Sequence, residues 1–394
     1  MRTFTLTHRT KIPLVPNHPI CLVLDSQNFT AIFLFIGRGV LREVQISNSS
    51  QVRGRLPKQD LLDIIESSHT LLTDLKSANI LVSGGSGFIG KWLVSTLLEA
   101  NEVMNLGLNV VVLTRDSQAA SSKLGAHKSD PLHFIQSDFS NSDTLEYPKN
   151  IFFTHIVHGA ISTTKSYGDT SSEDLIKSSK NGANALIERA SFQGNKPVLM
   201  HLSSGAVYGP QPLTLPRIPS DRVLGTGNEV ISDYALVKIN TETLVREAHE
   251  KAIIRGANPR LFSFFGPHVP IDQQFAIGNF IQDVILNRDI TVSGNPQTSR
   301  SYLYPTDLMH TLLVILTKPT IDDIQVGSSR ITTMGELATL ISNQFGRKGI
   351  NYSNPNSLES RYVPEMDCYE KSYKFEQKIS LEEGLARWRR WLDF

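Results

Sequence analysis

The chain has 394 residues and a formal net charge of +1. A chain of this length can bury a large core, so we expect one large domain or two closely joined ones. The near-zero charge gives no reason to expect nucleic acid or an anionic membrane as a partner. Two cysteines are too few for a disulfide framework or a thiolate zinc site, and no metal site is predicted.

The N-terminal residues 1–57 are predicted to form a short β-prone extension, whose role the sequence leaves open. They contain the pieces "ICLVL", "FTAIFLFI" and "REVQI", separated by clusters of Pro, Asn and Ser. The apolar run at residues 31–37 is far shorter than the roughly 20 residues of a membrane helix. No apolar signal core precedes a small-residue cleavage site. We therefore expect a cytoplasmic protein without a membrane partner.

From residue 58 onward the apolar spacing becomes helical, and from residue 79 short apolar runs alternate with helical segments. Strands are predicted in "NILVSG", "NVVVLT", "LHFIQSD", "IFFTHIVHGA", "PVLMHLSS" and "RLFSFF". Helices are predicted at residues 87–104, 172–192, 232–254, 275–287, 305–317, 333–345 and 380–392. This alternation predicts an α/β fold with a parallel sheet that helices cover on both faces.

A glycine-rich loop, "GGSGFIG", joins the first of these strands to its helix. Gly84, Gly87 and Gly90 have the spacing G-x-x-G-x-x-G, and Phe88 and Ile89 open the helix. A tight turn and a close approach to a pyrophosphate both require residues without a Cβ. The helix N-terminus adds free N–H groups and the positive end of a dipole. A strand before the loop and a helix after it favour a dinucleotide-binding site over a simple turn.

The end of the next strand bears on the choice between NAD and NADP. An acid there binds the ribose hydroxyls of NAD, whereas an arginine suits the 2′-phosphate of NADP. The strand ends at Thr114, followed by Arg115 and then Asp116. Arg115 gives a slight preference for NADP, although Asp116 could still serve NAD.

Two later strand ends carry further cofactor candidates. Asp138 ends "LHFIQSD" and could reach the adenine, although a loop cap is the alternative interpretation. The small residues Gly159 and Ala160 end the following strand, where they would let the cofactor lie close.

Within "DYALVK", Tyr234 and Lys238 are four residues apart on a predicted helix, and so lie on one face. A nearby ammonium favours the phenolate and lowers the pKa of a tyrosine, which makes the phenol a usable acid or base. The preceding strand ends with Ser203 and Ser204, at the edge where parallel sheets bind ligands. Either could supply a hydroxyl that binds the substrate oxygen beside Tyr234, and Ser203 is also a candidate cofactor contact.

From residue 58 to the C-terminus the chain resembles the extended short-chain dehydrogenases/reductases, specifically the nucleotide-sugar epimerase/dehydratase group. The resemblance rests on "GGSGFIG", "HGA", "SSGAVYG", "YALVK", "RLFSFFGP", "RSYLYPTDL" and "ISLEEGLARWRRWL", in the order of the family. It implies a doubly wound (Rossmann) sheet with a smaller substrate-binding domain. We place the dinucleotide-binding domain at residues 58–265 and the mainly substrate-binding domain at 266–394, with some elements returning to the sheet.

The resemblance also implies roles for individual residues. Tyr234 would be the catalytic acid/base, and Lys238 its partner, which also binds the nicotinamide ribose. Ser204 would bind the reacting sugar oxygen. Arg300 matches a position that grips the nucleotide diphosphate, and Asn279 lies where substrate-phosphate contacts fall, although an ordinary salt bridge is the alternative for Arg300. The implied substrate is a nucleotide-diphosphate sugar, and a homodimer is expected.

The implied reaction is hydride transfer at a hexose carbon, with C4 favoured, as an epimerisation or the reduction of a keto-sugar. The 4,6-dehydratases of the group carry an Asp–Glu pair directly after the catalytic hydroxyl residue, where this chain has Gly205 and Ala206. That difference weakens a dehydratase, and it also weakens a decarboxylase, which usually has a Glu near this place. An alternative from another class is an NAD(P)-binding sensor or scaffold without turnover.

Overall fold

The computed structural model describes residues 20–23, 31–37, 40–44, 51–52, 56–126, 130–139, 151–160, 172–222, 231–271, 275–346, 349–366, 369–370, 373 and 375–393. Much of the predicted N-terminal extension therefore lies outside the described residues.

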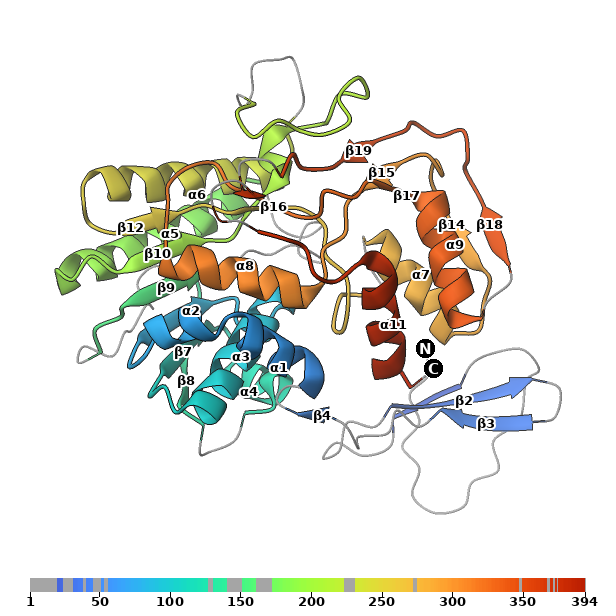
Figure 1. Cartoon of the computed structure of the whole chain (residues 1–394), viewed down its shortest axis with the longest axis horizontal. Coiled ribbons are helices and arrows are strands. Elements are labelled where there is room, and N and C mark those ends of the chain that lie inside the picture. The colour runs from blue at the N-terminus through green and yellow to red at the C-terminus, as the bar shows by residue number, and fades with distance from the viewer. Residues whose placement is uncertain are drawn as a thin grey trace.

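A six-stranded parallel sheet forms the centre of the fold (Figure 1). Its strands run in the order β12-β10-β9-β6-β7-β8, and every neighbouring pair is parallel. Their bounds are β6 (Asn79–Ser83), β7 (Asn109–Thr114), β8 (Leu132–Gln136), β9 (His155–His158), β10 (Val198–His201) and β12 (Arg255–Ala257). The predicted doubly wound parallel sheet is confirmed. The sequence does not predict β12, because "RGA" is too short and too polar to stand out as an apolar run.

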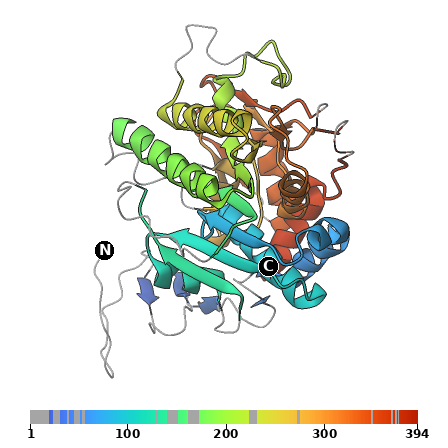
Figure 2. The ribbon, with the colours of Figure 1, turned by 90° about the vertical axis from the view of Figure 1, so that its left-hand side faces the viewer.

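Helices cover both faces of this sheet. Ile80 and Val82 of β6 pack into a cluster with helices α1, α3 and α8, whereas Leu81 packs into another cluster with α5 and α6. The helix bounds are α1 (Lys58–Ser67), α3 (Phe88–Met104), α8 (Pro305–Thr317), α5 (Ser172–Gln193) and α6 (Asp233–Glu250). The last two run side by side in both views (Figure 1 and Figure 2). Burial on both faces explains why these strands are nearly continuous apolar runs.

The strand order reverses between β6 and β9. From β6 the chain adds β7 and β8 on one side, and then crosses back to add β9, β10 and β12 on the other. Ligands of open parallel sheets bind outside the carboxyl ends of the strands at such a reversal. The glycine loop after β6 and the "HGA" segment of β9 both lie at this point.

The last third of the chain builds a second hydrophobic core, gathered to the right in Figure 1. It contains α7 (Ala276–Ile285), α9 (Met334–Phe345), α11 (Leu381–Trp391), β14 (Ile290–Val292) and β18 (Ile350–Tyr352). The four helices predicted after residue 270 are confirmed. Two elements return to the first part of the chain: α8 packs on α3, and β16 (Gln325–Val326) pairs with β13 (Arg260–Leu261). The boundary at residue 265 stays a prediction.

Shorter elements complete the fold. "RLFSFF" forms a strand only at β13, and "PVLMHLSS" divides into β10 and β11 (Ser203–Ser204), which pairs with β13. The helical stretch after residue 58 breaks at Ser68 into α1 and α2 (His69–Asp74). The other elements are α4 (Ser117–Leu124), the 3-10 helix η3 (Gly205–Tyr208), β15 (Ser299–Arg300), β17 (Thr332–Thr333) and β19 (Arg361–Tyr362).

The described part of the N-terminal extension is made of strands, as predicted. β1 (Ile20–Val23), β2 (Ala31–Gly37) and β3 (Val40–Val44) form an antiparallel sheet, and β4 (Gln51–Val52) pairs with β5 (Leu56–Pro57). None of the helices that the structure describes has both the length and the apolar character needed to span a membrane.

Candidate active site

Helix α6 carries Tyr234 and Lys238 one turn apart. Ser232 caps the start of the helix, because its side chain accepts a hydrogen bond from the Ala235 N–H at 3.3 Å. Lys238 is 4% exposed, and its Nζ lies 5.7 Å from the centre of the Tyr234 ring. The same Nζ donates a hydrogen bond to the backbone oxygen of Leu202, directly after β10. The helix thus brings the predicted pair to the carboxyl edge of the sheet.

Burial sets the charge of Lys238. Removal from water disfavours the ammonium and lowers the pKa of Lys238 from 10.5 to about 7, and the Glu242 carboxylate acts in the opposite direction. Both charge states of the lysine are therefore accessible near neutral pH.

Three consecutive residues after β10 are each held by a different side chain. Lys238 binds the backbone oxygen of Leu202, and the Ser203 hydroxyl donates to Glu242 Oε1 at 2.5 Å. The Ser204 hydroxyl lies 3.2 Å from the hydroxyl of Tyr362, which belongs to β19. Helix α6 therefore holds Ser203 through Glu242, whereas Tyr362 of β19 lies against Ser204. Helix α6 also packs on β11, the two-residue strand that both serines form.

A buried ion pair lies beneath this segment. Arg260 of β13 donates to both carboxylate oxygens of Glu242, from Nε at 3.1 Å and from Nη2 at 2.8 Å. Its Nη1 donates to the Tyr208 hydroxyl at 2.9 Å, and Nη2 lies 3.0 Å from Asp323 Oδ1. The pair is one helical turn beyond Lys238 and holds the Ser203 hydroxyl as well.

The glycine turn fits a dinucleotide. Gly84 has a φ of +77°, and a Cβ there would lie 2.8 Å from the Ala160 nitrogen and from the Gly159 carbonyl carbon. A Cβ on Gly90 would lie 2.2 Å from the Gly84 oxygen, so the helix packs directly on the turn. Gly87 is the N-cap residue of α3, and no described side chain forms a capping hydrogen bond there. An uncapped helix N-terminus after a glycine turn suits a pyrophosphate. Phe88 and Ile89 begin α3 and are half-buried against the core.

The end of β7 leaves the choice of dinucleotide open. Thr114 is half-buried and Arg115 is exposed. Asp116 caps helix α4, since one carboxylate oxygen accepts from the Ala119 N–H at 2.8 Å. The acid that could serve NAD thus has a structural role as well. Asp138 is exposed two residues after β8.

The sheet edge below the site carries two buried histidines. Ser83 Oγ lies 2.7 Å from His158 Nδ1, and the rings of His158 and His201 are 5.4 Å apart. Burial and the nearby Lys238 lower the pKa of His158 to about 3 and that of His201 well below its usual value. Both rings are therefore neutral at physiological pH.

Of the two predicted substrate-phosphate residues, one is linked to the Ser204 group. Arg300 lies opposite Tyr362 in the β15–β19 pair, and its guanidinium donates to the Ser360 hydroxyl at 3.0 Å. The same guanidinium donates to the backbone oxygens of Ser299 and Ser360, at 2.8 and 3.3 Å. Asn279 lies on α7, and no hydrogen bond between described side chains joins it to Ser204.

The position after Ser204 has no room for an acid. A Cβ on Gly205 would lie 2.5 Å from the Cζ atom of the Phe262 ring. Tyr362 packs on the other side of this region, with its ring centre 4.6 Å from that of Phe262. The aromatic pair therefore occupies the space that a side chain at residue 205 would need.

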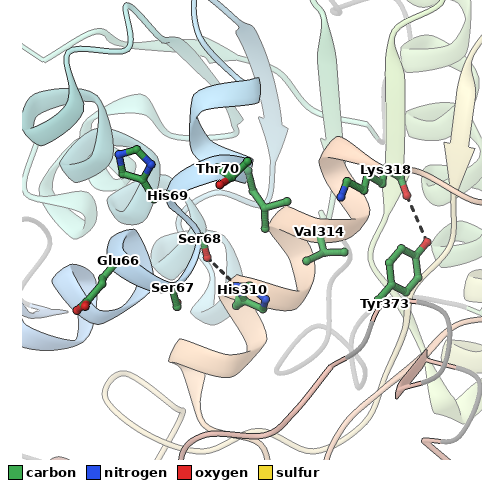
Figure 3. A pocket seen from close by; sticks show the side chains of 10 residues that line it. Glu66, Ser67, Ser68, His69, Thr70, His310, Val314, Lys318 and Tyr373 are labelled. Atoms are coloured by element: carbon green, nitrogen blue, oxygen red, sulfur yellow. Dashed lines mark hydrogen bonds between the residues drawn. The ribbon is translucent and has the colours of Figure 1, made fainter.

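A hollow of about 500 Å³ lies away from these residues (Figure 3). It is formed by the turn between α1 and α2, by α8 and by Tyr373. Ser68 Oγ lies 2.9 Å from His310 Nδ1 at its wall, and the Tyr373 hydroxyl donates to the Lys318 backbone oxygen. None of the predicted site residues lines it, so this hollow is distinct from the candidate active site.

This fold and this site define the class of the extended short-chain dehydrogenases/reductases. Within that class the chain belongs to the NAD dependent epimerase/dehydratase family, whose model matches residues 80–327. The resemblance inferred from the sequence motifs is confirmed.

Curated relatives match most of the chain. UDP-glucuronic acid decarboxylase 1 of Arabidopsis thaliana is 26% identical over 317 residues, which cover 79% of this chain and 69% of that protein. An uncharacterised protein of Methanocaldococcus jannaschii is 26% identical over 328 residues, covering 80% of this chain and 97% of that one.

Solved structures share the fold. An epimerase of Methanothermobacter thermautotrophicus has a TM-score of 0.69 at 20% identity, covering 84% of this chain and 95% of that one. A dTDP-glucose 4,6-dehydratase of Bacillus anthracis, in complex with NAD, has a TM-score of 0.67 at 19% identity, covering 80% and 96%. A UDP-glucose 4-epimerase of Thermotoga maritima, with UDP-glucose, has a TM-score of 0.65 at 21% identity, covering 80% and 98%.

The sequence does not predict Glu242, Arg260 or Tyr362 as residues of the site. Glu242 follows Lys238 by four residues, so the helical period could have placed both on one face. Arg260 and Tyr362 have no such local signal, because they reach the site only through the packing of β13 and β19.

Proposed function

We propose that this protein modifies a nucleotide-diphosphate sugar by NAD(P)-dependent hydride transfer, with C4 of a hexose as the reacting carbon. The observation that carries the proposal is that helix α6, with Tyr234 and Lys238 one turn apart, packs on β11 with Ser203 and Ser204, at the carboxyl edge of the sheet where the glycine turn also lies. Three of the proteins named in the comparisons, the UDP-glucuronic acid decarboxylase, the dTDP-glucose 4,6-dehydratase and the UDP-glucose 4-epimerase, have names that state a UDP- or dTDP-linked sugar, which supports this substrate class.

Each residue has a proposed task. A nicotinamide dinucleotide held at the glycine turn would supply the hydride chemistry. Tyr234 takes the proton of the sugar hydroxyl and later gives it back, and Lys238 fixes the ribose and supplies positive charge beside the phenol. Ser204 hydrogen-bonds the reacting oxygen. Arg300 binds the diphosphate with its planar guanidinium, and Asn279 is proposed to contact the phosphates more weakly.

Epimerisation and reduction of a keto-sugar use the same residues. A 4,6-dehydratase is disfavoured, because Phe262 closes the space at Gly205 where the acid pair would begin. A decarboxylase remains a second candidate through the relatives that are UDP-glucuronic acid decarboxylases. Oxidation at C4 would turn the carboxylate on C5 into a β-keto acid, which loses carbon dioxide readily. Arg115 supports a slight preference for NADP, and we also propose a cytoplasmic homodimer.

The first test is mass spectrometry of any nucleotide released when the purified protein is denatured. Retained NAD favours an internally recycled cofactor, as in an epimerase or a decarboxylase, whereas an empty site that titrates with NADPH favours the reductase. Incubation with UDP-glucose, UDP-galactose and UDP-glucuronic acid, followed by chromatography and mass spectrometry, then separates an epimer from a product that has lost carbon dioxide. If neither NAD nor NADPH binds, the proposal is wrong.

A further inference from the structure

The hydroxyl of Ser204 has two partners in the structure. Its oxygen accepts the backbone N–H of Ala206 at 3.2 Å, which caps η3, and it lies 3.2 Å from the hydroxyl of Tyr362. Tyr362 also donates to the backbone oxygen of Leu261 at 3.2 Å. A carbonyl oxygen only accepts, and a phenol has a single proton. The Tyr362 proton therefore points to Leu261, and the Ser204 hydroxyl donates its own proton to the Tyr362 oxygen.

This direction fixes how Ser204 can meet a substrate. The sugar hydroxyl has a single proton, which goes to Tyr234 in the proposed reaction, so Ser204 can serve the reacting oxygen only as a donor. When the sugar oxygen becomes a ketone it only accepts, so the Ser204 proton turns from Tyr362 toward it. Tyr362 thus accepts the hydrogen bond of the Ser204 hydroxyl whenever the sugar oxygen does not.

Tyr362 is itself held rigidly. Its ring packs on Phe262 at 4.6 Å between ring centres, and its strand pairs with the strand of Arg300, with the two residues directly opposite. Burial raises the pKa of Tyr362 above its usual 10, so the phenol stays neutral and takes no part as a base. The candidate diphosphate ligand and the partner of Ser204 therefore lie on two paired strands.

We propose that Tyr362 is a positioning residue that sets the direction of the Ser204 hydroxyl. Because Tyr362 lies opposite Arg300 on paired strands, it also fixes the distance between Ser204 and Arg300, and so the spacing of the sugar and the diphosphate. This inference rests on the proposed function, because it concerns the same site. It assigns a role to a residue 158 positions away from Ser204 in the chain.

The test uses the full-length protein with Tyr362→Phe, which keeps the ring packing on Phe262 and removes only the hydroxyl. The substrate is whichever of UDP-glucose, UDP-galactose and UDP-glucuronic acid the wild type converts. We expect kcat to fall about tenfold, which corresponds to about 1.4 kcal/mol, the upper end of the worth of one hydrogen bond. The affinity for UDP, which has no sugar, should stay within about twofold of the wild type. Tyr369→Phe, which removes a buried hydroxyl beside Phe375, is the control and should leave kcat unchanged.

A double-mutant cycle with Ser204→Ala separates positioning from general damage to the fold. If Tyr362 acts through Ser204, adding Tyr362→Phe to Ser204→Ala should cause no further loss of kcat. An equal tenfold loss in both backgrounds, or an unchanged kcat in the single variant, would overturn the inference while leaving the proposed function in place. A wild type that binds neither NAD nor NADPH would overturn the proposed function, and this inference with it.

Discussion

Arg260 holds the carboxylate of Glu242 with two nitrogen atoms, at 3.1 Å and 2.8 Å, in a place where both side chains are at least 95% buried. The same carboxylate accepts the Ser203 hydroxyl. A two-point pair in a buried site is directional, because both partners lose water and must be satisfied by each other. The strand end that carries the two serines is therefore anchored to helix α6 through this pair.

Glu242→Gln should be strongly destabilising, because among the described residues it leaves the buried Arg260 charge with the half-buried Asp323 as its one acidic partner. We expect the free energy of unfolding to fall by about 3 kcal/mol or more, as for other broken buried pairs. Denaturant titration measures it. The control is Glu382→Gln, which removes a surface pair with Arg330 and should cost about 1 kcal/mol or less. Equal effects for the two variants would contradict the buried pair.

Gly84→Ala should abolish tight dinucleotide binding. Gly84 combines a positive φ with backbone atoms 2.8 Å from the place of a Cβ, so strain and a clash add together. Gly194→Ala is a matched control, since Gly194 has a φ of +69° and no atom within 4 Å of its Cβ position. The control should cost only the strain of about 1–2 kcal/mol. Titration with NAD and denaturant unfolding measure both quantities, and retained NAD affinity in Gly84→Ala would refute the assigned turn.

Tyr234→Phe should lose turnover while keeping the cofactor. Removal of a general acid/base typically costs about 10²- to 10⁴-fold in kcat. The ring remains beside Lys238, so the retained nucleotide and the melting temperature should match the wild type. Product formation and released nucleotide are measured on the same samples. If neither the wild type nor Tyr234→Phe forms product, and the variant still performs the biological function of the wild type, the protein is a sensor or scaffold instead of an enzyme.

Lys238→Met should change how stability depends on pH. The folded pKa of Lys238 is about 7 and its ordinary value is 10.5, so between these values the unfolded chain binds one proton more. The free energy of unfolding of the wild type then rises with pH across this window, by about 1.4 kcal/mol per pH unit from this group. Below pH 7 the lysine is protonated in both the folded and the unfolded state, so this group adds no slope there.

Urea unfolding without added nucleotide at pH 7, 8, 9 and 10 measures this slope. The wild type should gain stability relative to Lys238→Met as the pH rises, because the methionine has no proton to release. A constant difference between the two proteins would show that Lys238 is not desolvated in the fold.

Most helices and most central strands were predictable from local patterns, although α4 was not predicted. Apolar runs and 3.6-residue periods depend only on neighbouring residues, and so does the glycine turn. The same holds for Tyr234 and Lys238, which one helical turn places on one face. Strand β12 was not predicted, because it is three residues long and includes an arginine and a glycine. Its strand identity comes from pairing with β10 and not from its own sequence.

By itself the sequence determined the order of most strands and helices, the glycine turn and the choice of Tyr234, Lys238 and Ser204 as candidates. Each of these features depends on a pattern of residues that are close together in the chain. Only the tertiary structure decided that Phe262 closes the space at Gly205 and that Tyr362 meets Ser204. Those contacts depend on how strands far apart in sequence pair and pack. Their partners are chosen by geometry across the fold, which no local pattern encodes.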